Sequence, residues 1–394
     1  MEISDFFQAL DMQQLGIDRD AHPLLISKRF RFNMAGSDFP DLNNVRIALF
    51  GVATRAEHND TACTDAPDAV RKALYSLFEG SPGMHLADLG NIRPGHSDGD
   101  TWFAVKSVVA GLIRQKTIPV ILGGRQHITY ANYLAYENLG QIINLAALDA
   151  RFDLGAKQDE ALNPRNYLSH ILTHKPNHLF NYANIGYQSY YVDQDAVELM
   201  EKLQFDAYRL GRVREDITEM EPVIRNADML SIDMSAIRQS DAPGSCHRSP
   251  NGFFGEEACQ LVRYAGLSEK LSSIGFYEYD PETDSGSQTA MLIAQMIWYF
   301  IEGVSLRSHD FPDPERKDAG EFLKYTVSIK DFRNKLVFYK SRKSDRWWME
   351  VPCPDKLRDK YERQLIVPCS LKDYQTACQD EIPEKWWQVY QKFL

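Results

Sequence analysis

The stretch LDARFDLG, residues 148–155, places two acidic side chains where they could share a metal ion. Asp149 and Asp153 follow an apolar run and are separated by three residues. In a turn just past a strand, two carboxylates at this spacing can converge on one hard cation, which prefers oxygen ligands. The residue midway between them is Arg151, whose guanidinium stays protonated and cannot bind a metal. The stretch therefore predicts a cation site with an arginine beside it.

Three further stretches carry polar side chains directly after apolar runs. They are LGGRQHITY (122–130), SIDMSAIRQSDAPGS (231–245) and YEYDPETD (277–284). The paired glycines of the first allow a tight turn, and Asp233 and Ser235 of the second share one face of an extended segment. Glu278 lies just past the last apolar run. Together these stretches predict one polar site assembled from several strand ends.

Apolar runs and helical periods alternate from about residue 45 to residue 305. The apolar runs predict strands at 46–52, 118–124, 142–149, 178–187, 205–211, 228–233 and 271–280. Helical periods lie between them, at 65–78, 101–115, 193–203, 255–266 and 285–303. Such alternation is typical of a mainly parallel sheet with helices on both faces, whose site lies past the carboxyl ends of the strands. We therefore predict a three-layer α/β/α domain with the polar stretches at one edge of its sheet.

The composition changes near residue 305, which predicts a division into an α/β domain (1–305), a linker (306–322) and a C-terminal extension (323–394). The linker is polar, charged and contains prolines. Beyond it, three apolar runs at 324–329, 335–341 and 346–351 predict an antiparallel β-meander. Ser370 and Asp373 then predict a capped helix. The extension should therefore be a small, β-rich appendage.

Tryptophan is concentrated in this extension, which holds four of the six in the chain, as Trp347–Trp348 and Trp386–Trp387. Consecutive side chains of a strand face opposite ways, so one tryptophan of each pair could pack inward and the other outward. Outward tryptophans are common at interfaces, which would suit a protein partner or self-association. The alternative is that both pairs pack the extension against the α/β domain.

The overall composition excludes several classes of protein. The formal net charge of -11 argues against nucleic acid or an anionic membrane as the main partner. The first residues carry no secretory signal pattern, and no apolar stretch is long enough to span a bilayer, so we expect a cytoplasmic protein. The six cysteines form no C-x-x-C pair and should be reduced thiols. Cys246 and His247 are adjacent, but neighbours in sequence usually point apart, which argues against a nucleophile and its base.

The four polar stretches, in this order and spacing, resemble motifs of the ureohydrolase family: the arginases, agmatinases and formimidoylglutamases. The family motifs are G-G-x-H, D-A-H-x-D, S-x-D-x-D followed by P-G, and E-x-x-P-x-x-D. The stretch DARFDL looks closest to the formimidoylglutamase form D-A-H-F-D-L, and APDAVRKAL resembles the family's early helix start. The resemblance covers roughly residues 45 to 303 and implies the family's three-layer fold. It does not cover the C-terminal extension.

In this family, two histidines and four aspartates bind two Mn²⁺ ions, which activate a bridging hydroxide. Carried over to this chain, the resemblance leaves Asp149, Asp153 and Asp233 as ligands. Residues of other types stand at the remaining three positions: Gln126, Arg151 and Ser235. His127 lies one residue out of register and could serve only if its loop shifted. By resemblance, one ion would use Gln126, Asp149, Asp153 and Asp233, whereas the other set, Asp149, Arg151, Asp233 and Ser235, is incomplete.

A count of formal charges bears on how many cations this site would hold. Three carboxylates facing Arg151 carry two excess negative charges, which one divalent cation would balance. Without a metal, one of the clustered carboxylates should take up a proton. We expect the guanidinium of Arg151 within hydrogen-bonding reach of Asp149 or Asp233, supplying the charge of the second ion. The cofactor is therefore one divalent cation, Mn²⁺ by the resemblance, or no metal at all.

Two functions follow from the resemblance. The first is a degenerate, non-hydrolytic relative that acts by binding a ligand or a partner. The second is an active hydrolase of the formimidoylglutamase type that cleaves linear amidine C–N bonds with one metal. In either case the site residues are Asp149, Asp153, Asp233 and Glu278, with Glu278 and Arg151 contacting a small amidine or amine ligand. Glu278 matches the family glutamate that holds the positively charged end of the substrate, or else it pairs locally.

Overall fold

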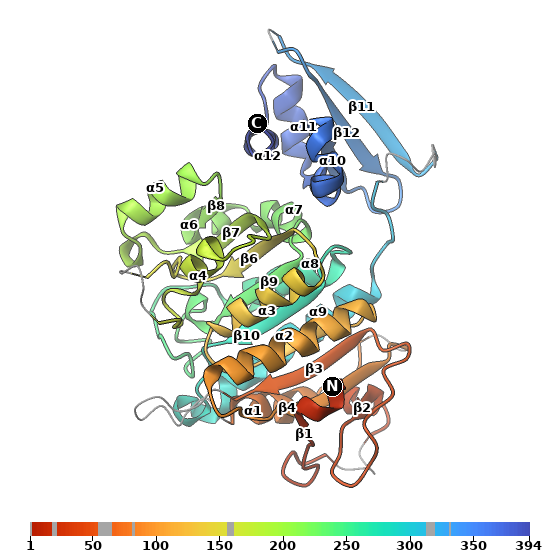
Figure 1. Cartoon of the computed structure of the whole chain (residues 1–394), viewed down its shortest axis with the longest axis vertical. Coiled ribbons are helices and arrows are strands. Elements are labelled where there is room, and N and C mark those ends of the chain that lie inside the picture. The colour runs from red at the N-terminus through yellow and green to blue at the C-terminus, as the bar shows by residue number, and fades with distance from the viewer. Residues whose placement is uncertain are drawn as a thin grey trace.

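A computed structural model describes residues 2–17, 22–53, 65–80, 83–155, 161–312, 320–330 and 332–394. Figure 1 shows a central sheet with helices on either side, and the C-terminal extension at the opposite end of the molecule from the first strands. Within these residues, no helix is long and apolar enough to cross a membrane.

Within the described residues the central sheet has ten strands, and all of them run parallel except the short β1. They are β1 (Phe7–Gln8), β2 (Phe30–Phe32), β3 (Ile47–Val52), β4 (Leu86–Ile92), β5 (Ile118–Leu122), β6 (Ile143–Leu148), β7 (Leu179–Tyr187), β8 (Asp206–Arg209), β9 (Met229–Asp233) and β10 (Ser273–Tyr277). The order is β1-β4-β3-β5-β10-β9-β6-β7-β8, with β2 beside β4. The seven predicted strands are confirmed, whereas β1, β2 and β4 are additions.

The strand order explains why the polar stretches meet. The strands β5, β10, β9 and β6 are consecutive neighbours, and each is followed by one of the four stretches. Their registers bring the carboxyl ends level, with Phe276 beside Leu122, Tyr277 beside Asp233, and Leu148 beside Ile232. In a parallel sheet all these ends open onto the same edge. The four stretches therefore form one site, as predicted.

Helices cover both faces of this sheet, which confirms the three-layer architecture. They are α1 (Ala66–Tyr75), α2 (Asp98–Arg114), α3 (Ile128–Asn138), α4 (Tyr167–Thr173), α5 (Gln194–Lys202), α6 (Leu210–Glu215), α7 (Met220–Arg225), α8 (Gly255–Leu267) and α9 (Gln288–Ser305). Alternate residues of β3 serve the two faces: Ile47 and Leu49 pack with α1, α8 and α9, whereas Ala48 and Phe50 pack with α2 and α3. This period of two is the geometric signature of a strand buried on both sides.

In the described part of the C-terminal extension, four antiparallel strands form a second sheet in the order β11-β12-β13-β14. Its elements are β11 (Phe322–Ser328), β12 (Lys335–Ser341), β13 (Trp347–Glu350), α10 (Asp355–Tyr361), β14 (Ile366–Cys369), α11 (Leu371–Cys378) and α12 (Glu384–Gln391). The predicted meander and the predicted helix α11, capped reciprocally by Ser370 and Asp373, are confirmed, and β14 is an addition. The domain boundaries stay a prediction, and residues 313–319 of the predicted linker lie outside the described residues.

The tryptophans of β13 join the extension to the α/β domain. Trp347 and Trp348 are both buried, Trp347 in the core of the extension and Trp348 against Arg225, so neither is left exposed at the surface. The guanidinium of Arg225, the last residue of α7, lies 4.4 Å over the ring of Trp348 and donates to the carbonyl of Trp347 at 3.1 Å. Trp386 is buried as well, and only Trp387 has substantial exposure, at 39%. Packing therefore accounts for three of the four tryptophans.

A buried carboxylate forms a second contact between the α/β domain and the C-terminal extension. Asp228, directly before β9, is fully buried and accepts a hydrogen bond from the backbone of Asn144 in β6 at 2.9 Å. Arg363 of the extension pairs with the same carboxylate, and Lys270 lies 3.8 Å from it. The next residue, Gln364, donates to the carbonyl of Ile142 at 3.1 Å. The extension thus covers the amino ends of β6 and β9.

We predict that Arg363→Gln lowers the free energy of unfolding by about 1–3 kcal/mol, because it removes a charged partner from a buried acceptor. The partly exposed position of Arg363 and the nearby Lys270 place the effect toward the lower end. Denaturant titration measures it. The matched control is Arg358→Gln on the exposed face of α10, which should change stability by less than about 0.5 kcal/mol. Equal free energies of unfolding for the two variants would show that the pairing of Arg363 with Asp228 does not stabilise the protein.

Candidate metal centre

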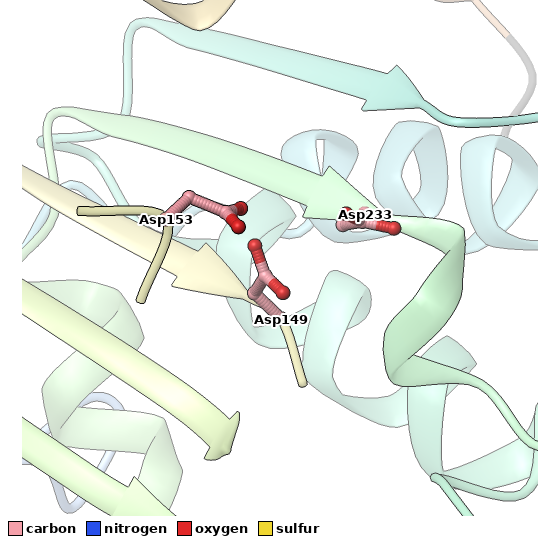
Figure 2. A group of neighbouring side chains, drawn as sticks. All are labelled: Asp149, Asp153 and Asp233. Carbon is pink, nitrogen blue, oxygen red and sulfur yellow. The ribbon is translucent and has the colours of Figure 1, made fainter. Parts of the chain in front are cut away.

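Three buried aspartates converge at the carboxyl edge of the central sheet. Asp149 and Asp153 follow β6, and Asp233 ends the neighbouring strand β9. One oxygen from each of the three carboxylates lies within 4.8 Å of the other two, and no side chain is more than 6% exposed. Figure 2 shows the carboxylates of Asp149 and Asp153 pointing toward one another, with Asp233 beside them. The structure therefore brings together the three aspartates that the sequence predicted.

Close approach of these acids shifts their protonation. Burial raises the pKa of Asp149 well above its usual range, and the charges of Asp153 and Asp233 raise it further. Burial also raises the pKa of Asp233 to about 6, with the charge of Asp153 adding to the effect. Burial raises the pKa of Asp153 as well, and its carboxylate points toward that of Asp149 (Figure 2). Burial and mutual repulsion therefore favour the uptake of a proton by these carboxylates when no metal is bound, as the sequence predicted.

Hydrogen bonds hold Asp149 in place from two directions. The backbone N–H of Arg151 donates to its Oδ1 at 2.8 Å, and the side-chain nitrogen of Gln126 donates to its Oδ2 at 2.9 Å. Gln126 is itself buried in the turn after β5, where Gly123 and Gly124 adopt positive φ values. The predicted tight turn is present, and it points Gln126 at the carboxylate cluster.

Several oxygen atoms around this cluster are buried without a hydrogen-bond partner. They are Oε1 of Gln126, Oδ2 of Asp153 and Oγ of Ser235. An unpaired buried acceptor costs free energy, so such atoms usually have a partner that completes them. Oxygen atoms of carboxylate, amide and hydroxyl groups are the ligands that Mn²⁺, Mg²⁺ and Ca²⁺ prefer. The residues present therefore fit one hard divalent cation.

The positions at which the resemblance places the remaining ligands of a second ion hold Arg151 and Ser235. Ser235 is buried and donates its backbone N–H to Oδ1 of Asp233 at 2.6 Å, so it supports the aspartate with its backbone. Its side chain offers a neutral hydroxyl in place of a carboxylate. Arg151, at the other position, offers no acceptor atom at all.

The guanidinium of Arg151 does not lie where the sequence predicted. It stacks 4.2 Å over the ring of Tyr191 and donates to the carbonyl of that residue at 3.3 Å. Among the described residues it forms no ion pair with Asp149 or Asp233. The expectation that it occupies the place of the second ion is therefore wrong, because the aromatic ring and carbonyl of Tyr191 hold it elsewhere.

Two other arginines do pair with the carboxylates of the site. Arg165, just before α4, lies 3.5 Å from Oδ1 of Asp153. Arg125, in the turn after β5, lies 3.2 Å from Oε2 of Glu278. Neither pairing was predicted from the sequence. Arg125 directly precedes Gln126 in the glycine turn, which was an available signal, whereas no pattern links Arg165 to Asp153.

Glu278 lies at the same edge and is fully buried. Its Oε1 accepts the backbone N–H of Gln126 at 2.8 Å, and its Oε2 lies 3.7 Å from Nε2 of His247 as well as near Arg125. Both Glu278 and Asp153 have left-handed backbone conformations, with φ of 63° and 50°. Such strain costs about 1–3 kcal/mol per residue and is concentrated at functional sites. A substrate-binding role for Glu278 stays a prediction.

His127 does not replace the family histidine. Its ring packs edge-on against Trp102 of α2, with ring centroids 6.2 Å apart. Burial lowers the pKa of its imidazole to about 4. Among the described residues, the group that could hold a metal contains only the three aspartates.

Comparisons with known proteins agree with this arrangement. The model of the arginase family matches residues 45–302. Formimidoylglutamase of Staphylococcus aureus (strain MSSA476) is 26% identical over 248 residues, which are 60% of this chain and 78% of that protein. The crystal structure of formimidoylglutamase from Bacillus subtilis has a TM-score of 0.59 at 21% identity, covering 75% of this chain and 99% of that one. Trypanosoma cruzi formiminoglutamase, solved with Mn²⁺, has a TM-score of 0.60 at 16% identity over 68% and 97% of the two chains.

We predict that Asp233→Asn stabilises the metal-free protein at neutral pH. The folded state holds the proton of Asp233 more tightly than the unfolded chain, because its pKa is about 6 against an ordinary 3.8. The wild type therefore loses stability as pH rises from about 4 to about 6, and the amide variant does not. In chelator at about pH 7.5 the variant should be more stable by about 1–3 kcal/mol, and the difference should vanish near pH 4.

Denaturant titration at several pH values measures this difference. Asp359→Asn, on the exposed surface of α10, is the matched control and should show no such pH dependence. A neutral-pH stability of Asp233→Asn equal to or below that of the wild type would show that the buried charge carries no cost.

Proposed function

Because this chain belongs to the arginase family and is similar to formimidoylglutamases, we propose that it is a non-hydrolytic member that holds one divalent cation and acts by binding a ligand. The observation that carries this proposal is the cluster of three buried carboxylates beside a second ligand set that contains Arg151 and Ser235. One cation can be bound in such a site, and the second lacks ligands.

Asp149, Asp153 and Asp233 would hold the cation. Gln126 would complete the set through its amide oxygen, which is buried without a partner and would face the ion after rotation of the amide. A bound ion would supply a Lewis-acid centre that polarises a ligand. Mn²⁺ is the expected ion, since the Trypanosoma cruzi structure of similar fold holds it and hard oxygen ligands suit it.

The absence of hydrolysis follows from the second ligand set. Two-metal hydrolases activate a bridging hydroxide between ions about 3.5–4 Å apart. Here the second ion would need Arg151, which has no lone pair to give, and Ser235, which has no charge. The guanidinium of Arg151 is also committed to Tyr191 rather than to the carboxylates.

An active hydrolase of linear amidines is the second candidate. One observation favours it: the three aspartates keep their convergent geometry, and a single ion can itself lower the pKa of a bound water. Both candidates predict one bound ion, and only the hydrolase predicts release of a product from a substrate. The number of ions and the hydrolysis of substrates are therefore measured separately.

We predict a stoichiometry of one Mn²⁺ per chain, measured by elemental analysis after equilibrium dialysis. Asp149→Asn, which keeps the shape of the side chain, should abolish binding because it removes a charge at the centre of the cluster. The triple change Gln126→His, Arg151→His and Ser235→Asp restores the six family ligands and should bind two ions. Two ions in the wild type, or none, would contradict the single-cation site.

We also predict no hydrolysis. With Mn²⁺ added, release of urea from arginine or agmatine, and of formamide from formimidoylglutamate, should stay at the rate of a protein-free blank, because no bridged hydroxide forms. The control is the triple variant, which carries the six family ligands and should bind two ions. Turnover by the wild type that Asp149→Ala abolishes would establish the hydrolase instead.

A further inference from the structure

A small pocket lies where the α/β domain meets the C-terminal extension, and it is called the junction pocket here. Its walls include Arg225, Lys270, Phe311, Arg346 and Trp348. Lys270 leads into the amino end of β10, so the junction pocket and the metal centre lie at opposite edges of the central sheet. The volume of the pocket is about 280 Å³, just below the range of about 300–1,000 Å³ usual for drug-sized ligands. A pocket of this size suits a small ligand.

Two hydrogen-bond donors of this pocket have no acceptor. Arg225 and Trp348 are only 5% and 2% exposed, and among the described residues neither Nη1 of Arg225 nor Nε1 of Trp348 has a hydrogen-bond partner. The other guanidinium nitrogens are used, because Nε donates to Oε1 of Glu221 at 2.8 Å and Nη2 donates to the carbonyl of Trp347 at 3.1 Å. A buried donor without an acceptor is costly, so such atoms usually have a partner that completes them.

The two donors are close enough to share one partner. The guanidinium carbon of Arg225 lies 4.4 Å from the centre of the Trp348 ring, over which it stacks. Nη1 is bonded to that carbon, and Nε1 is a member of that ring system. A single group with two or more acceptor atoms can therefore reach both nitrogens.

Positive charge exceeds its compensation in this part of the molecule. Arg225, Lys270 and Arg346 all line the pocket, and Arg225 and Arg346 share one carboxylate, that of Glu221, at 2.8 and 3.3 Å. Burial, with a further contribution from the charge of Arg346, lowers the pKa of Arg225. Burial also lowers the pKa of Lys270 to about 8. Both shifts mean that these buried cations lack part of the negative charge that would stabilise them.

The two carboxylates that line the pocket do not supply this charge to the unpartnered donors. Asp310 accepts a hydrogen bond from the hydroxyl of Ser344, and Glu269 accepts the backbone N–H of Asp310 at 3.2 Å. Among the described residues, neither carboxylate forms an ion pair or a hydrogen bond with Arg225 or Trp348. The missing acceptor therefore comes from outside the described chain.

We propose that the junction pocket binds a small oxyanion, a phosphate, sulfate or carboxylate group, which accepts from Nη1 of Arg225 and Nε1 of Trp348. Arginine suits this role because hydrogen bonds from a guanidinium to an oxyanion are charge-assisted and match its geometry. The site goes beyond the proposed function, since it shares no residue with the metal centre. A bound anion would connect α7 with β13 and so hold the extension against the α/β domain.

The indole N–H signals of the ¹⁵N-labelled full-length protein test this contact directly. Six tryptophans give six such signals, and the one that is missing from Trp348→Phe belongs to Trp348. After removal of divalent cations, the protein in chloride is titrated with inorganic phosphate, sulfate or acetate at constant ionic strength, which keeps general screening equal. We expect the Trp348 signal to shift saturably, its proton moving downfield as the N–H gains an acceptor. The anion with the lowest Kd distinguishes a tetrahedral ligand from a carboxylate.

Variants assign the binding to the two donors. Trp348→Phe keeps an aromatic ring beside Arg225 but removes the N–H, and calorimetric titration should show anion binding weakened by about tenfold or more. The matched control is Trp387→Phe on α12, where the tryptophan is 39% exposed, and its Kd should equal that of the wild type.

Arg225→Gln should abolish anion binding, because it removes the charge as well as the donor. Arg212→Gln, on the exposed surface of α6, is its control and should bind as the wild type does. If Arg225→Gln does not fold, the Trp348 variant still decides the question.

Two results would overturn the proposal. A Trp348 signal that stays in place at the highest concentration of each oxyanion would show that water satisfies both donors. Anion binding with the same Kd in the wild type and in Trp348→Phe would place the anion elsewhere on the protein. Neither result bears on the binding of Mn²⁺, so this proposal and the proposed function fail independently.

Discussion

Electrostatic repulsion among three buried aspartates is the constraint around which this end of the molecule is built. Asp149, Asp153 and Asp233 are held within 4.8 Å of one another, away from water, where each negative charge must be balanced by a proton, an arginine or a cation. In the metal-free protein the raised pKa of Asp149 favours a proton on that carboxyl group, and Arg165 lies 3.5 Å from Asp153. Such an arrangement lowers stability, and the left-handed backbone at Asp153 and Glu278 adds to the cost. Costly features of this kind are expected where a site has a function.

The fold holds this arrangement from both ends of the same strands. At the carboxyl edge, β6 leads into Asp149 and β9 ends at Asp233, so their register sets the distance between the acids. At the amino edge, Asp228 joins the two strands through Asn144, and Arg363 of the C-terminal extension pairs with Asp228. The extension therefore lies on the same two strands that carry the aspartates. It is packed as part of the molecule, through Trp347, Trp348 and Gln364, rather than attached only by a linker.

Features that depend on a local sequence pattern could be predicted, whereas side-chain directions that depend on a partner distant in the sequence could not. Alternating apolar runs were enough to locate seven strands and the carboxyl-edge site, because the strand period and the topology of parallel sheets constrain both. The strand β4 was missed because Asp88, Gly90 and Asn91 interrupt its apolar pattern, and these residues serve a buried pairing with Arg71. The predicted direction of the Arg151 side chain was wrong because its partner is Tyr191, which is distant in the sequence. Arg165 reaches Asp153 only through the folded loop before α4, which no local motif encodes.

The number of metal ions is the central claim, and the electron paramagnetic resonance spectrum of the Mn²⁺-loaded protein tests it most directly. Two manganese ions bridged in one site are exchange-coupled, whereas a single ion is magnetically isolated. With excess Mn²⁺ removed, the account predicts the hyperfine pattern of an isolated ion, unchanged at every loading up to saturation. Appearance of an exchange-coupled pair as the site fills would contradict it and would mean that Arg151 and Ser235 do not prevent a second ion from binding.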